Sequence, residues 1–288
     1  MNKYKQIIEK NNNIRLKILY YLNFNDRYNS CLVNNYFFKE IFKKINHIDI
    51  IKIDKKDINK VKEWKNINFL VDYSLSNIVN VSILKNCHTV NLSSCDNLVD
   101  VSALKNVKNL ILFNCRNITD VSMLKNVHEL NLSYCSNIKD VTMLGGVYKL
   151  NLSYCINITD ISNLGNVNKL NLSYCYNIKD FSMLGGNYEL NLSYCKINNV
   201  SQLYNVNKLI LYSCKNITDV SMLGGVHYLD LSYCINITDV SKLGNVYKLI
   251  LHFCEKITDV SMLTNVKYLN ISFCNRIKDR SMLNNIIR

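Results

Sequence analysis

The sequence contains no proline, only eight glycines and one tryptophan in 288 residues. No turn in this chain therefore depends on a prolyl ring. No stretch approaches the about 18 consecutive apolar residues of a membrane-spanning helix, and residues 1–13 are polar and lack the apolar core of a secretory signal. With 48% hydrophobic residues the composition is that of a globular protein. We expect no membrane association.

The excess of positive charge is concentrated near the N-terminus. The formal net charge is +13, and residues 1–66 hold 15 Lys and Arg against 7 Asp and Glu, while the remainder holds 20 against 15. A nucleic-acid-binding surface is typically a basic stripe on one face with aromatic residues between the charges. Short runs such as Lys43-Lys44 are more typical of solvated faces. Binding of nucleic acid is therefore not the expected function.

Twelve cysteines occur in a chain that shows no export signal. Disulfides persist in oxidising compartments and are rare in the cytosol and nucleus. We therefore expect twelve free thiols and a cytoplasmic location, in the cytosol or the nucleus.

Ten of the cysteines mark an internal repeat. They are 20 residues apart, with a single interval of 19, and stand at positions 95, 115, 135, 155, 175, 195, 214, 234, 254 and 274. One coil without the cysteine begins near Ile67, so the unit occurs about eleven times from there to the end. Weaker traces around Ile50 and Trp64 indicate one degenerate coil before it. A short internal period of this kind predicts a solenoid.

Each unit contains an alternating segment and a return segment. The alternation in Leu150-Asn151-Leu152-Ser153 predicts a short strand with its leucines inward and its polar residues outward. Ile158, Ile161 and Leu164 recur every three residues, which predicts a return segment that faces the same core. Because the unit is short, this segment is expected to be 3₁₀ or extended chain. Stacked coils bury one another's leucines and place the strands about 4.8 Å apart in a parallel sheet.

The cysteine ladder has a structural and a ligand-binding interpretation. In the structural one, Cys155 turns inward and bonds the backbone of the neighbouring coil. A zinc site needs four converging ligands, which a straight ladder does not offer. Disulfides between coils are permitted by a separation of about 5 Å, but parallel Cβ vectors and a reducing compartment disfavour them. The sequence favours buried thiols.

An aspartate ladder precedes the return turns. Capping of exposed N–H groups explains it better than calcium binding, because calcium-binding solenoids use glycine-rich loops and no glycine stands beside these residues. We expect no metal ion and no cofactor. The ladder consists of Asp100, Asp120, Asp140, Asp160, Asp180, Asp219, Asp239, Asp259 and Asp279.

Residues 14–45 do not follow the repeat and show helical periodicity. Ile14, Ile18 and Leu22 fall on one helical face. Asn25-Asp26 and Asn35 are suitable caps for two further short helices. Three short helices have little core of their own, so they pack on a partner or on the first coil of the solenoid.

The repeat sequence resembles a known family. The pattern Leu-x-x-Leu-x-Leu-x-x-Cys followed by Ile-Thr-Asp is similar to the cysteine-containing leucine-rich repeats of F-box proteins, and Ile-Thr-Asp-Val-Ser-x-Leu is similar to the short repeats of bacterial internalins. The resemblance implies an α/β repeat solenoid of 20-residue leucine-rich repeats over residues 47–288. It also implies a parallel β-sheet on the concave face, preceded by a small helical F-box-like segment over residues 1–46.

The N-terminal segment resembles an F-box. The matching residues are Leu16 to Leu22, Asp26, Cys31 to Val33 and Phe37. Asn13-Ile14 stands where the motif usually has Leu-Pro, and Arg27-Tyr28 replaces its usual leucine pair. The resemblance implies that the segment docks on the Skp-type adaptor of a cullin ligase. The implied adaptor-binding residues are Leu16, Ile18, Leu19, Leu22, Leu32, Val33 and Phe37.

An F-box followed by leucine-rich repeats resembles the substrate receptors of cullin–RING (SCF-type) ubiquitin ligases. In that family the repeats hold the target protein and the receptor catalyses nothing; it raises the target's effective concentration near the ligase. Proteins of this architecture and composition resemble those encoded by large DNA viruses of amoebae. The alternative is a ligase-independent protein-interaction scaffold whose helices only cap the solenoid. No enzyme is expected, because the five histidines are scattered and no nucleophile–base constellation is visible.

The outward strand positions are expected to form the partner-binding face. Departures from the consensus at Ile111, Phe113, Ile210, Tyr212, Asp230, Ile250 and His252 favour residues 209–253 as the contact region. An aromatic stripe runs along the same face, although stacked rings that only support one another are an equal alternative. The candidate partner-binding residues are Tyr134, Tyr154, Tyr174, Tyr194, Tyr212, Asp230, Tyr233, His252 and Phe253.

Two irregularities interrupt the repeat. One residue is missing between Cys195 and Cys214, and the same coil has Asn187 in place of the usual valine. Since the leucines on both sides keep their register, the deletion predicts a tightened corner and no break in the sheet. In the last coil Arg280 replaces an inward valine. A charge at an exposed end discourages stacking of whole molecules, so we expect a monomer.

Overall fold

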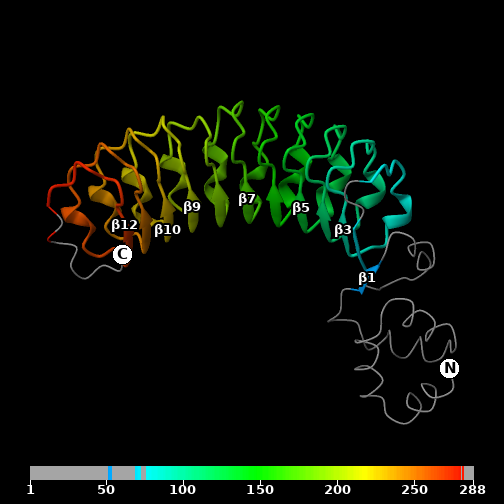
Figure 1. The fold of residues 1–288 in the computed structure, drawn as a ribbon, viewed down its shortest axis with the longest axis horizontal. Helices are drawn as coiled ribbons and strands as arrows, with labels where there is room; N and C mark the ends of the chain where they lie inside the picture. The colour runs from blue at the N-terminus through cyan, green and yellow to red at the C-terminus, as the bar shows by residue number, and fades with distance from the viewer. Residues whose placement is uncertain (1–50, 54–68, 73–75, 280, 282–288) are drawn as a thin grey trace, which may run out of the picture.

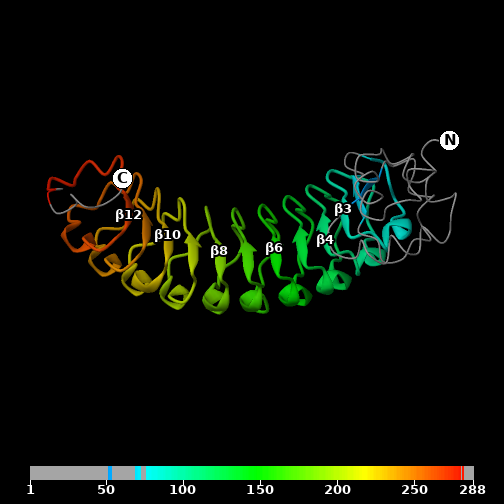
Figure 2. The same ribbon diagram turned by 90° about the horizontal axis from the view of Figure 1, so that it is seen from below.

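The structure is a computed structural model that describes residues 51–53, 69–72, 76–279 and 281. In this part of the chain the coils stack into one curved solenoid, with the strands along the inner edge of the arc (Figure 1). Figure 2 shows the strands side by side, with the 3₁₀ turns on one side and the turns that follow the strands on the other. The described part contains no helix that is long and apolar enough to cross a membrane.

Twelve strands in the described residues form one parallel sheet in sequence order, which confirms the predicted sheet. Neighbouring strands pair in register, so that Leu130, Leu150 and Leu170 lie side by side. The strands are β1 (Ile51–Ile53), β2 (Phe69–Asp72), β3 (Thr89–Asn91), β4 (Asn109–Ile111), β5 (Glu129–Asn131), β6 (Lys149–Asn151), β7 (Lys169–Asn171), β8 (Glu189–Asn191), β9 (Lys208–Ile210), β10 (Tyr228–Asp230), β11 (Lys248–Ile250) and β12 (Tyr268–Asn270).

A 3₁₀ turn precedes each strand from β3 onward, as the short return segment predicts. The turns are η2 (Ser82–Leu84), η3 (Ser102–Leu104), η4 (Ser122–Asn126), η5 (Thr142–Gly146), η6 (Leu164–Asn166), η7 (Ser182–Gly186), η8 (Ser201–Leu203), η9 (Ser221–Gly225), η10 (Ser241–Leu243) and η11 (Ser261–Leu263). We call the surface formed by these turns the 3₁₀ ridge.

The aspartate ladder bonds the N–H groups at the start of the return turns, as predicted, but from the position one residue before the N-cap, which is Val121 in η4. Asp120 Oδ1 accepts a hydrogen bond from the N–H of Ser122, the first residue of η4, at 2.9 Å. This N–H holds the pKa of the Asp120 carboxyl below its ordinary value, since the bond favours the charged form. Asn199, which replaces the aspartate in one coil, accepts the same bond from Ser201. Among the described residues, no group of three or more His, Cys, Asp or Glu is placed to hold a metal ion.

The core is a set of parallel apolar rows inside the coils. In the coil of β6, Leu150, Leu152, Ile158 and Leu164 are almost fully buried. Each of these side chains contributes about 1.5–3 kcal/mol on burial, and each is covered by its equivalents in the two neighbouring coils. One coil alone has no such cover, so the repeat is stable only as a stack.

The cysteines form the predicted inward ladder. Cys115 Sγ donates a hydrogen bond to the carbonyl oxygen of Leu92 in the preceding coil at 2.9 Å, and Cys155 Sγ donates to Leu132 O at 3.1 Å. The eleven described cysteines are buried and form no disulfide. Burial raises the pKa of the Cys115 thiol to about 11 and that of Cys135 to about 12. These thiols are therefore protonated and unreactive at neutral pH.

The residue before each ladder cysteine adopts a left-handed conformation, which the sequence did not predict. Tyr154 has φ 61° and Tyr174 has φ 62°, and the equivalent residues of the other coils from β3 to β12 lie between 55° and 63°. This conformation turns the chain sharply at the end of the strand. The following N–H then bonds back into the coil, as Cys155 N donates to Leu152 O at 3.0 Å. For a residue with a Cβ this conformation costs about 1–2 kcal/mol.

The coil with the deletion keeps the sheet intact, as predicted. β8 pairs with β9 in the regular register, Glu189 opposite Lys208. The missing residue is absorbed directly after Cys195, where Ile197 takes the buried position that Ile178 occupies one coil earlier. In the same coil Asn187 is buried and donates from Nδ2 to the carbonyl oxygens of Leu164 and Val167. Its Oδ1 has no hydrogen-bond partner.

Several predictions concern residues outside the described part of the chain. The three N-terminal helices, all seven adaptor-binding residues and the blunting role of Arg280 belong to this group. The boundary at residues 46–47 also lies there.

Candidate functional site

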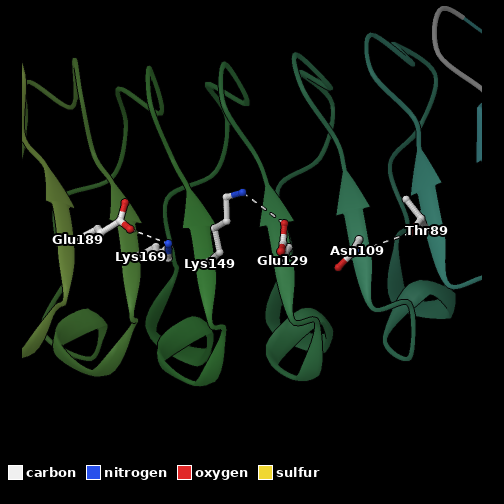
Figure 3. Close-up of polar contacts among 6 residues, drawn as sticks. All are labelled: Thr89, Asn109, Glu129, Lys149, Lys169 and Glu189. Atoms are coloured by element: carbon white, nitrogen blue, oxygen red, sulfur yellow. Dashed lines mark hydrogen bonds and ion pairs between the residues drawn. The ribbon is translucent and has the colours of Figure 1, made fainter. Parts of the chain in front are cut away.

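The solvent-facing side of the sheet carries three rows of side chains, and we call it the inner face. From β3 to β12, the first row consists of the first residue of each strand and the second row of the third residue. The third row consists of the residue directly before each of these strands. Figure 3 shows six members of the first row, Thr89 to Glu189, projecting from neighbouring strands. Because the strands are in register, residues one repeat apart are direct neighbours on this face.

Charges in the middle of the first row neutralise one another. Lys169 Nζ lies 2.6 Å from Glu189 Oε1, and Lys149 Nζ lies 3.4 Å from Glu129 Oε2 (Figure 3). Lys208 approaches Glu189 from the other side at 3.6 Å. The bond from Lys169 holds the pKa of Glu189 below its ordinary value. These pairs are half-exposed and contribute little stability, but they fix the charge pattern of this part of the face.

The second row is mostly asparagine, and its side chains shape the turn that follows the strand. Asn131 Oδ1 accepts hydrogen bonds from the N–H of Ser133 at 3.0 Å and from its Oγ at 2.6 Å. This arrangement corrects the sequence prediction for Ser153 and its equivalents: they are not outward strand residues. The strand ends at the asparagine, and Ser133 and Ser153 are buried in the turn.

Asp230 occupies an asparagine position and performs the same structural role. Its Oδ1 accepts from the N–H of Ser232 at 2.9 Å and from its Oγ at 2.6 Å. In strand register it lies between Ile210 and Ile250. The charge of Asp230 is therefore the feature that distinguishes it from the asparagines.

The predicted aromatic stripe is a continuous column of stacked rings, located in the turns after the strands and not on the strands themselves. Tyr134, Tyr154, Tyr174 and Tyr194 stack with centroid separations of 4.1–4.2 Å and interplanar angles of 13–18°. We call the full set the ring column. It consists of Phe113, Tyr134, Tyr154, Tyr174, Tyr194, Tyr212, Tyr233, Phe253 and Phe273.

Tyr212 keeps the ring column unbroken across an irregular coil. In that coil Ser213 holds the left-handed position that tyrosine holds elsewhere. Tyr212, one residue earlier, places its ring 5.3 Å from Tyr194 and 5.1 Å from Tyr233. Burial and the neighbouring hydroxyl of Tyr194 raise the pKa of Tyr212 to about 12. Since the ring faces cover one another, a partner has access mainly to ring edges and hydroxyl groups.

His252 belongs to the C-terminal end of this column. It makes edge contacts with Phe253 at 4.7 Å and with Phe273 at 5.3 Å. The structure thus brings Tyr212, Tyr233, His252 and Phe253 together beside the last strands. Asp230 is in the row next to them, on β10. The remaining predicted residues, from Tyr134 to Tyr194, continue the column towards the N-terminus.

Residues that the sequence analysis missed lie at the other edge of the last strands. Lys208 and Lys248 place their Nζ atoms over the ring of Tyr228, at 5.5 and 5.2 Å from its centroid. His227 stacks on Tyr247 with centroids 4.6 Å apart and planes 7° from parallel. A signal was present in the sequence: the two positions before the first leucine of each strand differ from coil to coil, whereas the leucines do not.

Comparison with solved structures supports the fold. An internalin (inlF) from Listeria monocytogenes matches with a TM-score of 0.56 and 19% identity, over 78% of this chain and 79% of that one. A chain of the TLR13–ssRNA13 complex matches with a TM-score of 0.53 and 20% identity. The match covers 79% of this chain and 38% of that one. No family model and no curated protein matches the sequence. The described coils therefore have the leucine-rich-repeat solenoid fold.

Proposed function

We propose that this protein is a non-catalytic binding protein whose inner face holds a partner protein. The observation that carries the proposal is the contrast between the two sides of each strand. The inward residue is leucine in every strand from β4 to β12, whereas the first outward residue changes repeatedly. The outward series is Thr89, Asn109, Glu129, Lys149, Lys169, Glu189, Lys208, Tyr228, Lys248 and Tyr268. Core packing does not require this variation, so recognition of a partner is the better explanation.

The ring column favours the same function. Tyr134 and Phe113 are more than one-third exposed at one end and Phe273 is 55% exposed at the other, while the rings between them are half-buried. Tyrosine provides a large, rigid contact area and a polar tip, and it is enriched at protein interfaces. The column borders the strand rows along the solenoid and offers ring edges and hydroxyls to a bound chain.

The more specific proposal is a substrate receptor of an SCF-type ubiquitin ligase. It is supported by the F-box resemblance of residues 16–37, where Leu19, Leu22 and Phe37 are among the residues that would contact a Skp-type adaptor. In this role the solenoid brings its target to the ligase and raises the local concentration of the target. We also propose action in the cytosol or nucleus, supported by the lack of a disulfide among the eleven described cysteines, and a viral origin, supported by composition.

An adaptor pull-down tests the ligase proposal. The full chain is mixed with a purified Skp-type adaptor. A Leu19→Asp/Leu22→Asp variant is compared with a Lys105→Gln control, whose substitution lies directly after η3. We expect the wild type and the control to retain the adaptor and the variant to lose it. If the wild type retains no adaptor, the ligase role is wrong and the scaffold alternative remains.

The broader binding function has its own test. Proteins that co-purify with the full-length chain are identified by mass spectrometry and compared with those recovered by a chain with Tyr154→Ala and Tyr194→Ala. Loss of specific proteins from the second sample supports binding through the ring column that borders the inner face. Identical recovery from both samples contradicts a role for the ring column.

A further inference from the structure

The last four described strands carry a group of cationic and aromatic residues at the edge where each strand begins. They occupy the two positions that precede each buried leucine of β9 to β12, with the exception of Asn207, which is neither cationic nor aromatic. We call this group the cation–aromatic patch, and it consists of Lys208, His227, Tyr228, Tyr247, Lys248, Lys267 and Tyr268. Four strands spaced about 4.8 Å apart make the patch about 15 Å long, which is the span of four or five residues of extended chain.

The side chains of the patch support one another. Tyr228 lies between Lys208 and Lys248, whose ammonium groups are 5.5 and 5.2 Å from its ring centroid. Tyr247 stacks on His227 at 4.6 Å and meets the edge of Tyr268 at 5.4 Å. Cation–π contacts at exposed sites contribute about 0.5–1 kcal/mol each. They hold the two lysine stems along the sheet surface instead of extended into solvent.

The positive charge of the patch is only partly neutralised. Lys208 shares Glu189 with Lys169. Lys248 and Lys267 form no ion pair with any described residue. The two carboxylates of the first row, Glu129 and Glu189, both lie towards the N-terminal side of the patch. Asp230, in the second row, has one oxygen committed to Ser232. The patch therefore differs from the middle of the inner face, where lysines and glutamates pair.

We propose that the cation–aromatic patch binds an acidic segment of the partner protein. Carboxylates of this segment would pair with Lys248 and Lys267, and an apolar side chain between them would pack on the exposed part of Tyr247, which is 43% accessible. Charge complementarity of this kind steers association and sets orientation. The inference deepens the proposed function and rests on it, because it names the chemistry of the partner.

An acidic polypeptide fits the patch better than a single-stranded nucleic acid. Proteins that bind such strands combine a basic groove along many phosphates with open ring faces on which bases stack. Here Lys208 and Lys248 cover Tyr228, and His227 covers one face of Tyr247. Three lysines spread over four strands also provide few phosphate contacts, and Glu189 and Asp230 border them.

Fluorescence anisotropy with the full-length chain tests the proposal. The probe is a fluorescein-labelled peptide of six glutamates with a central phenylalanine, measured at low and at moderate salt. The patch variant is Lys208→Gln/Lys248→Gln/Lys267→Gln. The matched control is Lys105→Gln/Lys125→Gln/Lys242→Gln, which removes the same charge from exposed residues in the 3₁₀ turns or directly after one of them. Circular dichroism checks that both variants are folded.

We expect the patch variant to bind the peptide about tenfold more weakly, and the control to bind within about twofold of wild type. Higher salt weakens wild-type binding, since the interaction is between charges. Equal weakening by the two variants, or no binding of the peptide by the wild type, overturns the proposal. Tighter binding of an oligouridylate of matched charge also overturns it and indicates a nucleic-acid site.

Failure of this inference is distinguishable from failure of the proposed function. If the patch variant still recovers the same co-purifying proteins as the wild type, the solenoid binds partners by other residues and the patch assignment is wrong. If neither chain recovers a specific protein, the proposed binding function fails, and the patch assignment fails with it.

Discussion

Asn131 and Ser133 form a two-residue unit in which one side-chain oxygen accepts both hydrogen bonds of the serine, at 3.0 Å from the N–H and 2.6 Å from Oγ. Wherever the second row has asparagine or aspartate from β3 onward, serine stands two residues later. The three coils with isoleucine instead have Phe113, Tyr212 or His252 at the serine position. A buried hydroxyl needs its acceptor, so the two positions change together.

This pairing predicts coupled effects of substitution. Asn131→Ile leaves the Ser133 hydroxyl buried without its acceptor, and we expect a loss of about 1–3 kcal/mol of unfolding free energy. The double variant Asn131→Ile/Ser133→His copies the coil of Ile250 and His252 and removes the stranded hydroxyl. We expect it to be more stable than the single variant in urea unfolding. Additive losses from the two changes would contradict the pairing.

The ring column predicts an unusual order of stabilities at Tyr174. Tyr174→Ala removes two stacking partners worth about 0.5–1.5 kcal/mol each and leaves a Cβ in a left-handed conformation with φ 62°. Glycine loses the same stacking but adopts this φ without strain. Thermal unfolding should therefore rank wild type above Tyr174→Gly, and Tyr174→Gly above Tyr174→Ala. The reverse order for the two variants would show that the backbone strain is not significant.

The buried thiols predict a loss of stability at alkaline pH. Burial raises the pKa of Cys87 and Cys115 to about 11 and that of Cys135 to about 12, from 9.0. Because the folded-state pKa is the higher one, the stabilisation is complete below pH 9 and is lost as the pH rises towards 11–12. Urea midpoints measured from pH 7 to 11 should fall steeply above about pH 9. A flat profile would contradict thiol burial.

Thiol titration provides an independent check on the cysteines. Unfolded protein prepared without reductant should show all twelve thiols of the sequence. Native protein should react slowly at the eleven described cysteines, because their side chains are buried and a reagent cannot reach them. A count of four or fewer in the unfolded protein would contradict both the ladder and the proposed location.

Asn187 predicts a stabilising substitution. Its Nδ2 has acceptors on Leu164 and Val167, but its buried Oδ1 has no partner. The equivalent residue in the neighbouring coils is Val167 or Val206. Asn187→Val removes the unpaired oxygen and adds apolar burial, so we expect a gain of about 1–3 kcal/mol. Urea unfolding measures it, with Asn187→Ala as the control for cavity formation. A loss on Asn187→Val would show that the two bonds of Nδ2 outweigh the unpaired oxygen.

The fold was predictable because the buried positions recur with the same period as the sequence repeat. Leucines such as Leu150 and Leu170 occupy the same position in consecutive units, and only stacking buries them all. The strand end was not predictable from alternation alone, since Leu152 is buried directly after β6 and continues the pattern of Leu150 beyond the strand. The left-handed Tyr154 contradicts the intrinsic preference of tyrosine, and stacking compensates for it.

The candidate site was only partly predictable for a related reason. Lys208, Tyr228 and Lys248 are 20 residues apart in sequence, and their contact requires the register of β9, β10 and β11. The ring column was visible as a stripe of aromatic residues, but its position in the turns followed from the backbone. A row of identical residues is visible in the sequence repeat. A contact between different residues on neighbouring coils can be identified only once the strand register is known.

The hydrogen bonds that side chains donate to main-chain carbonyl groups of a neighbouring coil all run in one direction along the described chain. Cys135 Sγ donates back to Leu112 O, Asn137 Nδ2 donates back to Arg116 O, and Asn163 Nδ2 donates back to Thr142 O. Each coil thus brings the donors that satisfy carbonyl groups of the coil made before it. During synthesis from the N-terminus, every newly completed coil has its acceptors already in place. The solenoid is therefore suited to vectorial growth on the ribosome, one coil at a time, without waiting for the C-terminus.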